Sequence, residues 1–159
     1  MIDIDEAIRL RAEGKLEESN AILCRLAREN PNDPIVQYQC AWSFDVLGLE
    51  RDAIPHYTNA IRLGLQGDDL RGAYLGLGST YRTIGAYRES KAVFDEALQS
   101  FPDDAALQVF YAMTLYNLGE HAQSMKLLLR LVADPTACED VAAYQKAICL
   151  YAEDLDRVW

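Results

Sequence analysis

The sequence has few of the residues on which catalytic sites depend. Histidine occurs only twice among the 159 residues, as His56 and His121, and no nucleophile motif of the type GxSxG, HExxH or SxxK is present. The glycine-containing stretch at residues 72–78 lies in a helical pattern with no strand before it, so it is no dinucleotide-binding loop. We therefore expect no catalytic residue, no cofactor and no enzymatic activity, and we expect His121, at a position where an aromatic residue is usual, to pack rather than react.

Cysteine is also scarce, and its spacing argues against a metal site. The cysteines form no CxxC pair, and no histidine lies near enough in sequence to complete a zinc ligand set. They are Cys24, Cys40, Cys138 and Cys149. We expect reduced, mostly buried thiols. Cys138 differs from the others because a place in the first turn of the last helix would favour its thiolate, although an ordinary thiol is the alternative.

Basic residues and long hydrophobic runs are missing as well. The chain has 15 basic and 25 acidic residues, a net charge of −10, whereas nucleic acids and anionic lipids attract clustered lysine and arginine. No run approaches 18 uncharged apolar residues, since the best, 125–133, contains Lys126 and Arg130. The first residues lack the basic and apolar regions of a secretory signal. We therefore expect a cytoplasmic protein that binds neither membrane nor nucleic acid.

What the sequence does contain is an internal repeat marked by Gly14, Gly48, Gly85 and Gly119, at spacings of 34, 37 and 34 residues. Small residues recur seven positions before and five after each glycine, and large apolar residues recur four before and nine after. The small residues are Ala7, Ser19, Ala41, Ala53, Gly78, Ser90, Ala112 and Ser124. Such a period predicts helical hairpins that must stack, because each alone leaves an apolar face bare.

This pattern resembles the tetratricopeptide repeat, which has 34 residues, two antiparallel helices, small residues where they cross, a turn glycine and a proline near the end, here Pro31 and Pro102. The third unit matches best, with Tyr74, Leu77, Gly78, Tyr81, Gly85, Tyr87, Ala97 and Pro102. The resemblance implies a small stand-alone bacterial protein with an all-α fold. We expect one domain over residues 1–159, an α-α superhelix (solenoid) of about four hairpins at 1–33, 34–67, 68–104 and 105–138, plus a C-terminal capping helix.

Two segments depart from the repeat. Three extra residues fall within 63–70 and predict either a longer connection or a backward extension of the next helix. The tail lacks the turn glycine and predicts one long helix over 137–158, opened by a capping box at Thr136 and Glu139. Its apolar stripe consists of Val141, Tyr144, Ile148, Tyr151, Leu155 and Val158. This helix either covers the last unit or also pairs with another chain.

In the family that the chain resembles, the first helices of successive units line a concave groove in which ligands bind. Carried onto this sequence, the groove positions include Ile4, Ile8, Tyr38, Trp42, Leu75, Arg82, Val109, Phe110, Met113, Tyr116 and Asn117. Aromatic residues and methionine are enriched at interaction sites, which favours a binding groove. The alternative is that the tail helix or a tight superhelix covers several of them. Gly72 and Gly76 either open a trough beside Arg82 or permit close helix packing.

The function that follows is a non-enzymatic scaffold that binds a peptide or helix of a partner protein in this groove. Arg82 is the expected contact for a polar or acidic ligand group. The groove positions do not match the lysine and asparagine pattern with which chaperone-binding arrays hold a terminal carboxylate, so we expect no such clamp. The alternative function is that of a homodimeric structural protein that self-associates through the C-terminal helix or the groove.

Overall fold

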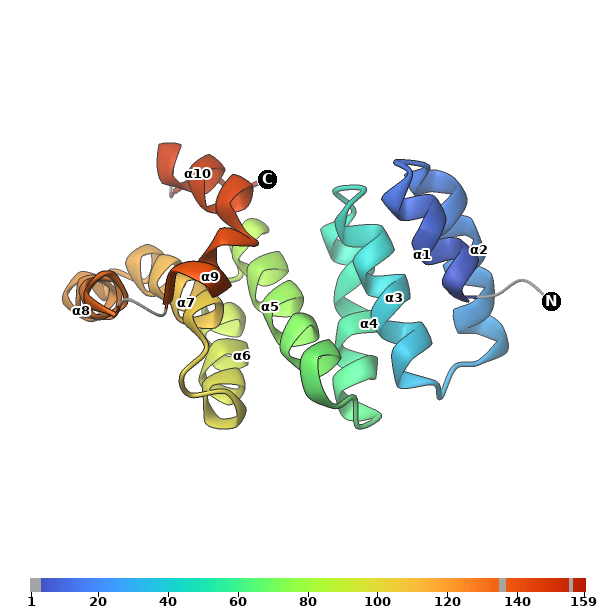
Figure 1. Cartoon of the computed structure of the whole chain (residues 1–159), viewed down its shortest axis with the longest axis horizontal. Coiled ribbons are helices and arrows are strands. Elements are labelled where there is room, and N and C mark those ends of the chain that lie inside the picture. Colours follow the sequence, from blue (N-terminus) through green and yellow to red (C-terminus); the bar gives the residue numbers. More distant parts are fainter. Residues whose placement is uncertain (1–3, 135–136, 155) are drawn as a thin grey trace. The chain divides into compact units, whose positions relative to one another are not determined.

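The computed structural model describes residues 4–134, 137–154 and 156–159, without the side chains of residues 137, 138, 140 and 152. Every regular element in this part of the chain is a helix, which confirms the all-α prediction (Figure 1). The helices are α1 (Ile4–Ala12), α2 (Leu16–Glu29), α3 (Pro34–Asp45), α4 (Glu50–Arg62), α5 (Gly67–Thr83), α6 (Tyr87–Ser100), α7 (Ala105–Asn117), α8 (His121–Ala133), α9 (Ala137–Ala142) and α10 (Gln145–Glu153). The predictions for the Cys138 thiol, for the Thr136 cap and for Leu155 in the stripe fall outside the described residues.

The small residues of the repeat meet where the two helices of a hairpin cross. The Ser19 hydroxyl donates to the carbonyl of Ala7, and the Ser124 hydroxyl to that of Ala112, each at 2.7 Å. A larger side chain at either position would hold the helices too far apart for this bond. The turn glycine ends the first helix with a positive φ, for example 81° at Gly119, which other residues rarely adopt. These contacts give the repeat its two columns of small residues.

Helix starts follow from local capping. The Asp33 carboxylate accepts hydrogen bonds from the backbone N–H groups of Ile35 and Val36, and Pro34 occupies the first position of α3, where no N–H is needed. Asp104 caps α7 in the same way, by accepting from the backbone N–H of Leu107. Helix α5 instead begins at Gly67 and is 17 residues long, against 12 for α3. The extra residues of the third unit therefore extend its first helix backward.

Contacts between residues divide the chain into two compact units, Met1–Thr80 and Tyr81–Trp159. One core cluster of the first unit is built from α1, α2 and α3. Its buried residues are Ala7, Leu23, Ala27, Val36 and Cys40. The single domain and the unit boundaries drawn from the repeat stay predictions, and each compact unit is described separately below.

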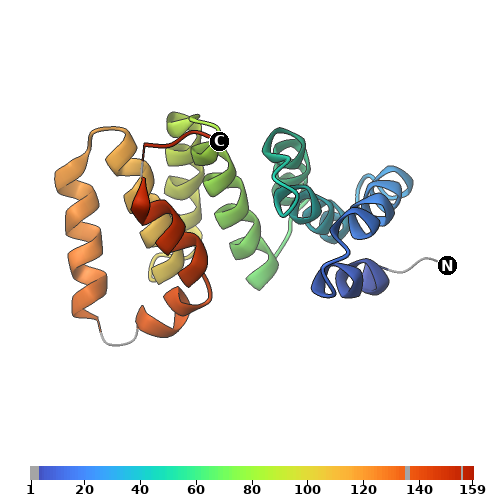
Figure 2. The same cartoon turned by 90° about the horizontal axis from the view of Figure 1, so that it is seen from above.

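The prediction of one uninterrupted helix over 137–158 is wrong. The chain leaves helical geometry between α9 and α10, and Tyr144 lies at the start of α10 with φ −111° and ψ 13°. After α10 the described residues, 154 and 156–159, are not helical, and the backbone N–H of Trp159 donates to the carbonyl of Thr83 at 2.9 Å. The break lets the tail follow the surface of α7, which contacts α9 and carries the aromatic partner of α10 (Figure 2). Apolar residues at steps of three and four do not distinguish one helix from two.

Among the cysteines, burial follows the prediction only in part. Cys40 is buried and Cys24 half-buried, and burial raises the pKa of both thiols. Cys149 is exposed, contrary to the expectation for that position. Of the helices in the described ranges, none is long and apolar enough to cross a membrane.

Candidate functional site

The predicted groove residues all lie on first helices of the hairpins, and they fall into two sets. The set of the first compact unit lies on α1, α3 and α5 and consists of Ile4, Ile8, Tyr38, Trp42 and Leu75. The set of the second unit lies at the end of α5 and on α7 and consists of Arg82, Val109, Phe110, Met113, Tyr116 and Asn117. We call these sets the first face and the second face.

Trp42 is the most prominent residue of the first face, because 41% of this large apolar side chain is exposed. Its ring is held on one side by the Arg11 guanidinium, 3.9 Å from the ring centroid, and lies 6.0 Å from the ring of Tyr38. Arg11 is fixed in turn by a 2.6 Å hydrogen bond from its Nη2 to Oε1 of Gln39. Tyr38, in contrast, is buried. The first face thus presents an ordered and accessible cation–π pair.

Arg11 stands at a groove position of the first repeat unit, but it was not among the residues predicted to contact a partner. Within the described part of the chain its hydrogen bonds reach only Gln39, and no carboxylate lies within ion-pairing distance of it. Burial lowers the pKa of Arg11, yet a guanidinium stays protonated near neutral pH. The repeat offered a signal for it, because Arg11 precedes Gly14 by three residues as Arg82 precedes Gly85.

A half-buried carboxyl group, that of Asp45, belongs to the same compact unit. The Tyr57 hydroxyl donates to Oδ2 of Asp45 at 3.0 Å. Burial raises the pKa of Asp45 to about 6, and the hydrogen bond from Tyr57 opposes this shift. Asp45 is therefore committed to Tyr57 rather than to a cation.

The two glycines of α5 do not open a trough. A Cβ atom on Gly72 would overlap the hydroxyl of Tyr38, and one on Gly76 would overlap the ring of Tyr57. Both tyrosines are buried, and their rings lie 6.3 Å apart. Of the two interpretations of these glycines, close packing is the one that the structure supports.

The second face is covered by the tail of the same chain. Phe110, only 2% exposed, meets the rings of Tyr144 and Tyr151 edge-on, at centroid distances of 5.8 Å and 6.3 Å. These two tyrosines belong to the apolar stripe of the tail. For the second unit, the tail therefore covers groove positions, which was the alternative to an open groove.

Arg82, the expected ligand contact, is 4% exposed and is engaged within the chain. Its Nε donates to Oδ1 of Asn117 at 2.8 Å, and its guanidinium lies 5.0 Å from the ring centroid of Tyr151. Asn117 also donates to Oδ1 of Asp156 at 3.5 Å. Burial lowers the pKa of Arg82, while Tyr151, Tyr87 and Asp156 act in the opposite direction. The tail thus brings an aromatic ring and a carboxylate to this arginine.

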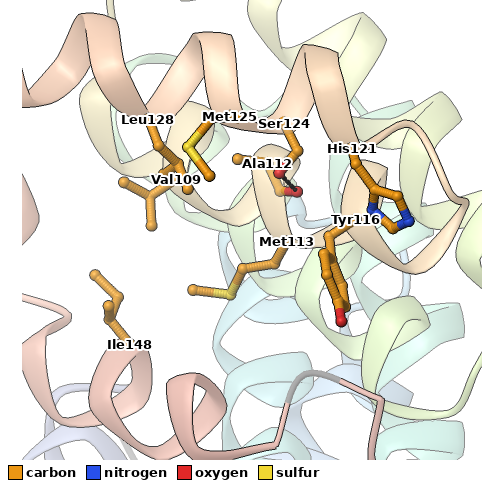
Figure 3. A pocket seen from close by; sticks show the side chains of 9 residues that line it. All are labelled: Val109, Ala112, Met113, Tyr116, His121, Ser124, Met125, Leu128 and Ile148. Atoms are coloured by element: carbon orange, nitrogen blue, oxygen red, sulfur yellow. Dashed lines mark hydrogen bonds between the residues drawn. The ribbon is translucent and has the colours of Figure 1, made fainter.

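The tail does not close against α8. Two apolar cavities of about 420 Å³ each lie between α7, α8 and the tail, and Ile148 of α10 lines both of them. Figure 3 shows the first cavity, which Met113 and Val109 of the second face also line. Met125, Leu129 and Val132 of α8 are exposed, and of these Met125 lines the first cavity and Val132 the second. The tail therefore leaves apolar side chains of α8 exposed beside the two cavities.

Both histidines pack against aromatic rings, which the sequence predicted for His121. The His56 ring stacks on Phe44 at 5.6 Å, and its Nδ1 lies 2.7 Å from Oε1 of Gln37. Burial lowers the pKa of His56. His121 lies 5.0 Å from the ring of Tyr116. Across the described ranges, no group of three or more histidine, cysteine or acidic side chains is placed to hold a metal ion.

Three comparisons bear on this arrangement. The model of the family described as "Tetratrico peptide repeat" matches residues 34–155. Superkiller protein 3 of Saccharomyces cerevisiae (strain ATCC 204508 / S288c) is 32% identical over 94 residues, which cover 55% of this chain. The chain spans only 6% of the length of that relative.

Two solved structures share the fold at low identity. YrrB, described as a TPR protein with an unusual peptide-binding site, has a TM-score of 0.69 and 17% identity over 97% of this chain and 77% of its own. Naa15/Naa10 bound to HypK-THB gives a TM-score of 0.59 and 18% identity over 96% of this chain and 24% of the other. Because the family model matches most of the chain and the hairpins carry its turn glycines, this protein belongs to the tetratricopeptide repeat family, whose fold generally mediates protein–protein interaction.

Proposed function

We propose that this chain is a non-catalytic scaffold that binds a peptide or helix of a partner protein through the concave positions of its first helices. Members of its family generally act as scaffolds without catalysis. The observation that carries the proposal is Trp42, a large aromatic side chain that is exposed and yet held in place by Arg11. Aromatic residues of this kind supply much of the binding energy at protein interfaces.

The two faces enter this proposal differently. On the first face, Trp42 and its neighbours on α1 and α3 are the contacts we expect a partner to use. On the second face, residues such as Arg82 and Phe110 become available only when the tail leaves them. The tail itself supports the proposal, because it demonstrates that these positions accept an amphipathic segment with aromatic side chains.

The experiment is affinity purification of the wild-type chain and of a Trp42→Ala variant from native cells, with the captured proteins compared by mass spectrometry. Losing one aromatic anchor is expected to weaken partner binding by about 2 kcal/mol or more. Leu49→Ala, in the turn after α3, is the matched control because Leu49 is a similarly exposed apolar residue, and it is expected to leave capture unchanged. Undiminished capture by Trp42→Ala would show that the first face is not the binding surface.

A homodimer is the second candidate. The uncovered apolar side of α8 favours it, because exposed Met125, Leu129 and Val132 lie close together along one helix. Self-association through the stripe of the tail would instead require the tail to leave Phe110 of its own chain. Light scattering after gel filtration separates the candidates, since a strict monomer at high protein concentration excludes the dimer.

A further inference from the structure

Arg11 has the position and surroundings of a group that awaits a carboxylate. It is half-buried, its Nη2 is taken by Gln39, and its Nη1 makes only a long 3.5 Å contact with the Gln39 carbonyl. In the described part of the chain no carboxylate lies within ion-pairing distance. Arginine groups held at a fixed geometry are well suited to carboxylate recognition, because the planar guanidinium can donate two parallel hydrogen bonds.

On the second face, the arginine at this repeat position is already in contact with a segment of the tail. Arg82 stands three residues before its turn glycine, as Arg11 does. The tail brings the ring of Tyr151 to 5.0 Å from the Arg82 guanidinium, and Asp156 accepts a hydrogen bond from Asn117, the partner of Arg82. The ligand at this face is therefore an aromatic side chain followed by an acidic one, separated by a few residues.

We propose that the first face binds an acidic partner segment, with Arg11 donating to a carboxylate of that segment and Trp42 packing against an apolar or aromatic side chain next to it. This inference rests on the proposed function and names the chemistry of its partner. It also moves the acid-binding role from Arg82 to Arg11, because Arg82 is engaged by Asn117 and Tyr151.

The surroundings of Arg11 support this assignment. The titratable groups that act electrostatically on the guanidinium are Tyr38 and Tyr57, and both are uncharged near neutral pH. The Asp45 carboxyl group accepts a hydrogen bond from the uncharged hydroxyl of Tyr57, not from Arg11. The exposed part of Trp42 gives an incoming side chain an apolar surface beside the charge. A purely apolar partner would leave the half-buried charge of Arg11 without compensation.

The test uses the full chain and a synthetic peptide with the sequence of residues 150–159, fluorescently labelled and amidated at its C-terminus. This probe carries Tyr151 and three acidic residues, Glu153, Asp154 and Asp156. The tail of the chain competes for the second face at an effective concentration of about the millimolar level, so micromolar peptide reports on another site. Binding is followed by fluorescence anisotropy.

We expect Arg11→Gln to weaken peptide binding by roughly 10- to 100-fold, the usual effect of losing a charge-assisted hydrogen bond. Arg11→Lys keeps the charge but loses the planar fork and its stacking, so a smaller loss is expected. Arg9→Gln is the matched control on the same helix, since the Arg9 side chain is 64% exposed, and it is expected to bind like the wild type.

Changes in the peptide test the same idea with the unaltered chain. A peptide whose three acidic residues are replaced by their amides should bind at least about 10-fold more weakly than the acidic one. A third peptide, neutral in its side chains but with a free C-terminal carboxylate, separates the two sources of carboxylate. If binding of the acidic peptide depends on Arg11, the group that Arg11 binds is a side-chain carboxylate. If only binding of the third peptide depends on Arg11, that group is the C-terminal carboxylate.

Two outcomes would overturn the inference. If the amide peptide binds as tightly as the acidic one and its binding requires Trp42, the first face is a binding surface without carboxylate recognition, and the proposed function stands. If the acidic peptide and the free-carboxylate peptide both fail to bind at about 1 mM, the inference fails. The proposed function is then tested separately, by comparing the partners captured by the wild type and by Trp42→Ala.

Discussion

The two faces of this protein derive from the same repeat positions and end in opposite states. Arg11 and Arg82 stand at equivalent places, three residues before a turn glycine. Arg11 lies on an exposed tryptophan, whereas Arg82 is buried under Tyr151 of the tail. The repeat therefore decides where a side chain is placed, and a segment outside the repeat decides whether solvent can reach it.

The largest effect should come from removing the anchor of the tail. Phe110→Ala would take away a buried ring that contacts Tyr144 and Tyr151, at an expected cost of about 3–5 kcal/mol in the free energy of unfolding. Trp42→Ala, on the exposed first face, should cost only about 1 kcal/mol through its lost stacking on Arg11. Urea unfolding gives both values, and amide hydrogen exchange follows α10. Unchanged protection of α10 in Phe110→Ala would contradict the role of this ring.

A second effect is that the free energy of unfolding should depend on pH through a carboxyl group of the first compact unit. Three residues before a turn glycine, the first compact unit has Asp45 as well as Arg11, and the second has Tyr116 as well as Arg82. Burial raises the pKa of Asp45 from 3.8 to about 6, so the folded state binds this proton more tightly than the unfolded state does. The contribution of the carboxyl is most favourable below its unfolded pKa and is lost as the pH rises through the folded pKa.

Asp45→Asn should therefore raise the free energy of unfolding at about pH 8 by up to about 3 kcal/mol, from 1.36 kcal/mol for each pKa unit. At about pH 4 the two proteins should be nearly equal, because the wild-type carboxyl is then largely protonated in the folded state. Urea unfolding at both pH values measures this. A stability difference that is the same at both would contradict the buried position of the carboxyl group.

A smaller loss of stability tests whether tyrosine side chains fill the space beside α5 in the first compact unit. Gly76→Ala should destabilise by about 1–3 kcal/mol, because the new methyl group overlaps Tyr57. Helix propensity alone would favour alanine by about 1 kcal/mol, so the sign of the result separates the two effects. A double-mutant cycle with Tyr57→Leu should reveal strong coupling. Additive changes would mean that Tyr57 does not occupy the space above Gly76.

The fold could be predicted from the sequence because its period has a local cause. The small residues recur where two backbones approach closely, as the bond from Ser19 to Ala7 demonstrates, and the glycines recur where φ is positive. Both constraints act within one hairpin, so a short stretch of sequence contains all the information. The capping aspartates Asp33 and Asp104 are local signals of the same kind.

The state of the groove could not be predicted in the same way. Whether Phe110 is open or covered depends on the path of the tail, and its apolar stripe fits one helix or two equally well. The interpretation of Gly72 and Gly76 likewise depended on Tyr38 and Tyr57, which lie on other helices. The repeat places Arg11 and Arg82 at the same groove position, but it does not show that the Arg11 guanidinium lies on the ring of Trp42.

The exposed side of α8 has a consequence for growth of the array. Each repeat of a solenoid contacts only its neighbours, and a terminal repeat normally presents a polar outer face. Met125, Leu129 and Val132 instead leave α8 with exposed apolar side chains beside the cavities that the tail does not fill. These side chains could pack against a further apolar helix, which makes α8 a suitable place for lengthening the molecule by design.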